Sequence, residues 1–222
     1  GRIKIYRIDG SISKESSKIQ QANHRIVGAW LDKPLLPEMF AAVEAGDRTV
    51  GRSLDDWQTF YQGVTRLASH LEFAGYNSAV VPALCEGSTI YPSALLEPTP
   101  KYDTGVYLTG GEDPLRKDVL EMMFRVFDRE GLMLFPSLQF NTPLPELERL
   151  RAGNAQVRAG IELVNSQGQT WLQQHDAQGG LAPFYNPLDP RVGKAMVAVV
   201  NELTQRYGHH PSFGGIVLQL SP

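Results

Sequence analysis

The side chains best suited to chemistry in this sequence lie at the ends of four short apolar runs, or just after them. They combine aromatic rings, carboxylates and carboxamides. Aromatic rings stack on the apolar faces of sugars, and carboxylates and amides bind sugar hydroxyls, so this mixture is typical of a carbohydrate site. The candidates are Trp30 and Asp32 from the first run, Cys85, Glu86 and Tyr91 from the second, Gln139 and Asn141 from the third, and Gln219 and Ser221 from the fourth.

Asp32 and Glu86 are the only carboxylates in this set, which makes them the candidate catalytic residues. Glycoside hydrolysis generally uses two carboxylates that flank the scissile bond, roughly 5 Å apart in retaining enzymes and further apart in inverting ones. Each assignment has a structural alternative: a solvated or structural carboxylate for the acids, core packing for Trp30, and a turn at Tyr91. The candidate substrate-binding residues are Trp30, Tyr91, Gln139, Asn141, Tyr185 and Gln219.

Motifs for other chemistries are missing from the sequence. There is no G-x-S-x-G elbow, P-loop or H-E-x-x-H motif, and no G-x-G-x-x-G follows a strand-like run. The single cysteine, Cys85, has no partner for an internal disulfide, and we interpret it as a small buried apolar side chain. His209 and His210 follow a helical pattern, where histidine more often interacts with the helix dipole than with a metal. We therefore expect neither a metal nor a cofactor.

The composition predicts a globular protein with a sizeable core. The chain has 222 residues, of which 42% are hydrophobic. Its 21 Lys and Arg residues nearly balance 24 Asp and Glu residues, and no basic run is interleaved with aromatic residues, so we do not expect a nucleic-acid partner. No uninterrupted apolar run reaches about 18 residues, so we do not expect a membrane partner either.

Apolar runs alternate with amphipathic segments along the chain. Four buried strands are predicted at 25–32, 77–83, 132–138 and 215–220. Apolar residues spaced three and four apart predict helices between Ser53 and Gly75, between Asp113 and Gly131, and between Asp189 and Gly208. With right-handed crossovers, this order predicts an α/β fold, either about four parallel β/α units of a partial (β/α)8 TIM-type barrel or a doubly wound open sheet.

Two stretches interrupt this alternation. Residues 1–23 are polar and rich in Ser, Lys and Gln, typical of a linker or of the remnant of a preceding domain, so we expect the folded domain over 24–222. Residues 141–188 form a long connection, either a functional wall or a surface insertion, with a short helix expected at 145–151 and a hairpin across 160–172. Because the chain begins with Gly and no helix follows its last strand, we expect a fragment of a longer protein.

Several segments of the chain resemble a known family in order and spacing. They are Arg25–Leu31, Ala74–Asn77 through Ile90–Ser93, Leu108–Leu115, Asp128–Leu132, and Asn186–Val192 followed by Gly215–Leu218. They resemble the glycosyl hydrolase-like family of bacterial proteins often labelled family 10 glycosylhydrolases, over roughly residues 24–222. The resemblance implies a TIM-type barrel of which the chain holds about the first four units, a glycoside or other polysaccharide as substrate, and a secreted or periplasmic location.

The chain departs from that family at the strand tips. Gln219 and Leu220 stand where the family typically has two aspartates, and Leu84 and Ser88 stand where it commonly has Arg and Asp. Neither an amide nor Leu can exchange a proton near neutral pH. We therefore expect no glycosidase turnover from this chain alone.

Three functional hypotheses are open at this point. The first is a glycoside-hydrolase-like domain that acts on or binds polysaccharide. The second is a non-catalytic carbohydrate-binding or scaffold module with a degenerate barrel site. The third, an open doubly wound domain with unrelated chemistry, needs a glycine-rich phosphate turn that the segment after Asp32 does not provide. Exposed half-barrel edges further predict a homodimer or a larger assembly, and the candidate site residues are expected on one concave face.

Overall fold

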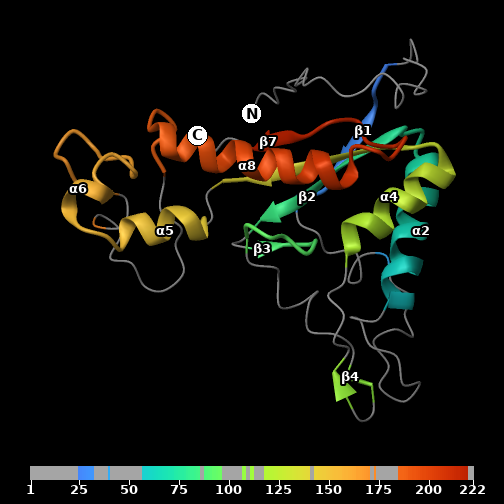
Figure 1. Ribbon diagram of the computed structural model, residues 1–222. Helices are drawn as coiled ribbons and strands as arrows, with labels where there is room; N and C mark the ends of the chain where they lie inside the picture. The colour runs from blue at the N-terminus through green and yellow to red at the C-terminus, as the bar shows by residue number, and fades with distance from the viewer. Residues whose placement is uncertain are drawn as a thin grey trace.

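The fold is a curled half-barrel of parallel strands with helices between them (Figure 1). The computed structural model describes residues 25–32, 40, 57–85, 88–96, 107–108, 111–112, 118–140, 143–170, 173 and 185–219. The main sheet has the order β1 (Gly28–Trp30), β2 (Ser78–Cys85), β6 (Met133–Gln139) and β7 (Val217–Gln219), and every one of these neighbours is parallel. This confirms the predicted strand order. A doubly wound sheet would reverse its order partway, so the structure is the partial barrel.

The boundaries of β1 and β2 differ from the predicted ones. β1 has three residues in place of the eight predicted at 25–32, because the Asn77 side chain bonds the backbone below it. Its Oδ1 accepts from Val27 N at 2.9 Å, and its Nδ2 donates to Arg25 O at 2.9 Å. β2 extends two residues beyond its predicted end, because the short antiparallel strand β3 (Ser88–Thr89) pairs with its tip.

Helix α2 (Trp57–Phe73) ends close to its predicted stop. Gly75 has a φ of 77°, and Tyr76 N donates to Leu71 O at 2.8 Å, so the glycine closes the last turn in the left-handed region. The predicted start at Ser53 lies outside the described residues.

Helix α4 (Val119–Glu130) begins later than predicted. Its N-cap is Asp118, which accepts from Glu121 N at 2.9 Å, so the predicted start at Asp113 is wrong. Gly131 ends the helix as predicted, with a φ of 70°.

Helix α8 (Pro190–Tyr207) has the predicted boundaries. Asp189 accepts from Arg191 N at 2.9 Å, Pro190 occupies the first turn, and Gly208 follows the last residue. These three features are all local in sequence.

The long connection contains the predicted helix and less of the predicted hairpin. Helix α5 (Pro145–Arg151) has the expected boundaries, and the hairpin is reduced to a single antiparallel bridge between Val164 and Thr170. Helix α6 (Ala155–Arg158) of this connection was not predicted, and neither was the two-stranded ladder of β4 (Tyr107–Leu108) and β5 (Gly111–Glu112) before α4.

Side chains of the main sheet alternate between an outer face and an inner face. On the outer face, Ala79, Val81, Leu134 and Leu138 join one hydrophobic core with the apolar faces of α2, α4 and α8. The inner face is the side of the sheet that points away from these helices. Among the described residues, no helix is both long and apolar enough to cross a membrane.

Candidate functional site

The carboxyl ends of β6 and β7 bring two predicted site residues together. Gln139 and Gln219 are the last residues of neighbouring strands and are paired in register. The Gln139 Nε2 donates to the Gln219 Oε1 at 2.7 Å. Within the described part of the chain, the Gln139 Oε1 and the Gln219 Nε2 have no partner, and both side chains are half-buried. The pair therefore presents one acceptor and a donor group to a ligand.

Trp30 lies on the same face as this amide pair. In the sheet it is in register with Val80, which is in register with Phe135, and Phe135 is four residues before Gln139 on β6. Parallel partners in register point to the same side, and residues an even number apart on one strand do too. Trp30, Gln139 and Gln219 therefore share the inner face. Trp30 is level with Phe135, four residues before Gln139, so the two positions are about 13 Å apart along the strand direction.

The carboxylate candidates are only partly described. Asp32 follows β1 and is exposed. Glu86 and Asn141 lie outside the described residues, as do Leu220 and Ser221.

Tyr91, a predicted binding residue, is packed between the sheet and α8. Its side chain is buried, its ring meets the Tyr207 ring edge-on with centroids 5.9 Å apart, and its hydroxyl donates to Glu202 at 3.1 Å. Burial and the Glu202 carboxylate raise the pKa of the Tyr91 hydroxyl. The same carboxylate accepts from Ser93 Oγ and from Ala94 N, each at 2.6 Å. In this arrangement Tyr91 anchors the segment after β3.

Tyr185, also a predicted binding residue, has a similar environment in the long connection. It is buried, its hydroxyl accepts from Leu144 N at 2.8 Å, and it donates to Glu148. Burial and Glu148 raise the pKa of this hydroxyl. Arg151 pairs with Glu148 and, at 3.2 Å, with Glu162. These contacts tie Tyr185 to helix α5 rather than to the amide pair.

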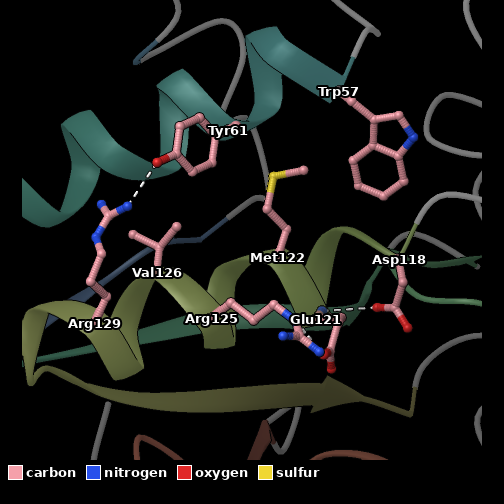
Figure 2. Close-up of a pocket in the computed structure, with 8 residues that line it drawn as sticks. All are labelled: Trp57, Tyr61, Asp118, Glu121, Met122, Arg125, Val126 and Arg129. Carbon is pink, nitrogen blue, oxygen red and sulfur yellow. Dashed lines mark hydrogen bonds and ion pairs between the residues drawn. The ribbon is translucent and has the colours of Figure 1, made fainter.

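A groove between α2 and α4 lies on the outer layer of the fold, away from the inner face (Figure 2). It has a volume of about 410 Å³. Trp57 and Tyr61, which belong to the apolar pattern of α2, are 36% and 44% exposed because they line this groove instead of the sheet. The Arg129 Nη1 donates to the Tyr61 hydroxyl at 2.7 Å across it.

Sequence reasoning missed a polar cluster around His210. The His210 ring contacts Asp128 and Glu121 of α4, so the interpretation of this residue as a dipole partner of the preceding helix is wrong. Glu121 and Asp128 are seven residues apart, two turns along the same face of α4, but this spacing does not indicate which residue they contact.

Comparisons with known proteins give structural neighbours only. No family model matches the chain, and no curated protein does. α-L-Fucosidase isoenzyme 2 from Paenibacillus thiaminolyticus matches 90% of the chain with a TM-score of 0.54 and 17% identity. A bacterial fucosidase with an iminocyclitol inhibitor and a GH29 α-L-fucosidase from Bacteroides thetaiotaomicron match at TM-scores of 0.38 and 0.34, with 10% and 11% identity over 82% of the chain. The fold of the chain is similar to that of part of the Paenibacillus fucosidase.

This chain is much shorter than the structures it matches. It spans 24% of the Paenibacillus fucosidase and 37% and 36% of the other two chains. At these identities the likeness concerns the fold alone.

Proposed function

We propose that this chain forms part of a polysaccharide-binding cleft at the carboxyl end of a glycoside-hydrolase-like barrel. The observation that carries the proposal is the amide pair of Gln139 and Gln219 at the tips of neighbouring parallel strands. Ligand sites of (β/α) barrels are built at the carboxyl ends of the strands, which is where this pair lies.

The chemistry of the amide pair suits sugar hydroxyls. A hydroxyl both donates and accepts, and the pair offers the Gln139 Oε1 as an acceptor and the Gln219 Nε2 as a donor. Trp30, 37% exposed on the same face, adds an aromatic surface for an apolar sugar face. Because Trp30 and Gln139 are separated along the strands, this arrangement favours an oligosaccharide over a single sugar.

More specifically, we propose that the chain is the first half of a barrel similar to that of the family 10 glycosyl hydrolase-like proteins. Gln219 and Leu220 then replace that family's aspartates, and Glu86 and Asp32 remain the candidate acids. Hydrolysis by this protein would need two carboxylates that flank the scissile bond, and Glu86 and Asp32 are the candidates within the chain.

The second candidate function is a non-catalytic carbohydrate-binding or scaffold module. The observation that favours it is that both described strand tips of the site carry neutral amides, which bind hydroxyls but transfer no protons near neutral pH. Turnover distinguishes the two candidates.

The binding proposal is tested with a panel of soluble polysaccharides and α-L-fucosides, measured by calorimetry. Gln139→Ala and Gln219→Ala each remove hydrogen bonds worth about 0.5–1.5 kcal/mol, so we expect a roughly 3- to 10-fold higher Kd. Gln167→Ala, at an exposed glutamine of the long connection, is the matched control and should bind as the parent does. Equal affinities in all three variants would remove the amide pair from the site.

Hydrolysis is assayed on the same panel with the unmodified chain, Glu86→Gln and Asp32→Asn. We expect no turnover from the chain alone, since general acid assistance contributes on the order of 10²- to 10⁴-fold in rate. Turnover that Glu86→Gln abolishes would make Glu86 a working acid or nucleophile and would reject the scaffold alternative.

Self-association is a further part of the proposal. Among the described strands of the main sheet, β1 and β7 pair on one side only, and Ile26 and Val27 beside β1 are 49% and 40% exposed. Edges of this kind pair with other strands, so we propose a homodimer through them. Light scattering after size-exclusion chromatography tests this, and a monomer at all accessible concentrations would contradict it.

A further inference from the structure

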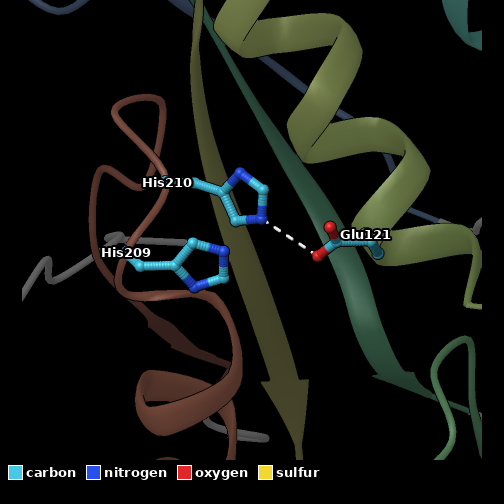
Figure 3. Close-up of side chains that lie close together, drawn as sticks. All are labelled: Glu121, His209 and His210. Carbon is cyan, nitrogen blue, oxygen red and sulfur yellow. Dashed lines mark hydrogen bonds and ion pairs between the residues drawn. The ribbon is translucent and has the colours of Figure 1, made fainter.

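A compact polar cluster lies near the amino ends of β6 and β7, at the other end of the sheet from the amide pair (Figure 3). Its centre is His210, in the turn after α8, with a side chain that is 5% exposed. The ring Nδ1 is 2.6 Å from Asp128 Oδ2, and the Nε2 is 3.0 Å from Glu121 Oε2. Both ring nitrogens of a buried imidazole therefore face carboxylate oxygens.

A neutral His210 ring cannot donate to both carboxylates. A neutral imidazole has a single N–H, so it can donate to only one of the two carboxylates, and its other nitrogen would face an anion with a lone pair. Either a second proton or a metal cation resolves this conflict. A cation between the Nε2 and Glu121 would leave the Nδ1 proton bonded to Asp128.

His209 offers a third ligand for a cation between the His210 Nε2 and Glu121. Its ring centroid is 4.2 Å from that of His210, and one ligand atom each from Glu121, His209 and His210 all lie within 4.8 Å of one another. Zn²⁺ binds such atoms at about 2.0–2.2 Å, so tetrahedral ligand atoms are roughly 3.4 Å apart. His209 is exposed, so its side chain has room to rotate toward that spacing.

The residues behind the ligands hold them in place. Asp128 Oδ1 accepts from Ser212 N at 2.8 Å and from Ser212 Oγ at 2.6 Å, so the acid that bonds the His210 Nδ1 is itself fixed. Glu121 Oε1 accepts from Arg125 Nε at 2.8 Å, and the Phe124 ring stacks on the His210 ring with centroids 4.9 Å apart. Metal-bound histidines typically donate their second N–H to a carboxylate in this way.

We propose that Glu121, His209 and His210 bind one Zn²⁺ or similar divalent transition metal. Two imidazoles and one carboxylate are ligands that zinc prefers, whereas Mg²⁺ and Ca²⁺ take oxygen ligands. Three protein ligands leave a fourth position for water. The metal would fasten α4 to the turn before β7, and this revises the expectation that the chain holds no metal.

The proposal is tested on the full 222-residue chain after chelation and desalting, with Zn²⁺ titrated by calorimetry and Co²⁺ by visible absorption. We expect one equivalent to bind, and a melting temperature that rises with metal concentration. His209→Ala should abolish saturable binding while leaving the melting temperature in chelator unchanged, because this side chain is exposed. His70→Ala is the control, at an exposed histidine of α2, and should bind metal as the parent does.

Asp128→Asn tests the positioning of His210. The new amide would donate to the Nδ1 and move the ring proton to the Nε2, which then cannot bind a metal. We expect about 10- to 100-fold weaker binding and an altered Co²⁺ spectrum, whereas a merely structural role would change only the melting temperature. The proposal is overturned if the parent chain shows no saturable binding, or if His209→Ala binds Zn²⁺ as tightly as the parent.

Discussion

The two ends of the sheet place polar side chains in opposite ways. At the carboxyl end, Gln139 and Gln219 are neutral, half-buried and bonded to each other. At the amino end, His210 is enclosed by two carboxylates and an aromatic ring. In (β/α) barrels the carboxyl end carries function and the amino end carries stability. The comparison shows that the neutral amide pair remains partly accessible, whereas the groups that join α4 to the turn before β7 are packed and paired with one another.

The carboxylates at the amino end are adapted to remain charged. Burial alone would raise the pKa of Asp128, but the Ser212 hydroxyl and the His210 ring outweigh it and leave the pKa below its ordinary value. Burial likewise would raise the pKa of Glu121, but His210 and Arg125 lower it by more. No titrating group takes part in the bond between the two glutamines at the other end.

Removing the aromatic support of the amino end should have the largest effect on stability. Phe124 is fully buried and stacks on Tyr207 and His210. Phe124→Ala is expected to lower the free energy of unfolding by about 3–5 kcal/mol because it leaves a cavity in the core. Gln139→Ala removes one part-buried hydrogen bond and should lower it by only about 1 kcal/mol. Urea unfolding of both variants checks this, and similar losses in the two would erase the contrast between the ends.

A smaller effect on stability is expected from removing the buried hydroxyl of Tyr91. Tyr91→Phe keeps the ring and removes only the donor to Glu202, which still accepts from Ser93 and Ala94. We expect a loss of about 1 kcal/mol in the free energy of unfolding. Tyr76→Phe is the control, because Tyr76 is exposed and should tolerate the change. Equal stabilities of these two variants would mean that the Glu202 contacts do not hold the segment after β3.

The smallest effect on stability is expected at Asp189, which caps the start of α8 at the carboxyl end of the sheet. Hydrogen bonds from the Arg191 side chain, and then from its backbone N–H, lower the pKa of Asp189 to about 2. A carboxyl with a folded pKa below its unfolded value stabilises the fold above about pH 4 and loses that contribution as the pH falls toward 2. Asp189→Asn should therefore be less stable than the parent near pH 6, and the difference should shrink as the pH falls through 2. A difference in unfolding free energy that is constant with pH would contradict the role of the charge.

The helix ends and strand order followed from the sequence because their signals are local. Asp189 with Pro190 begins α8, and Gly131 ends α4, through contacts within a few residues. The start of α4 was misplaced because Asp113 and Asp118 both have the right side chain, and local pattern cannot choose between them. The order of the strands follows from apolar runs that alternate with single amphipathic crossovers.

The surroundings of the polar residues were decided by tertiary structure. The sequence predicted that the tips of parallel strands would meet, but only the register of β6 and β7 brings Gln139 and Gln219 into contact. The partners of Tyr91 and His210 are 111 and 82 to 89 residues away. A side chain carries no local mark of a partner that distant, because the pairing depends on how helices pack on the sheet. The sequence by itself therefore determined the elements and their order, and packing determined which polar groups remain open to a ligand.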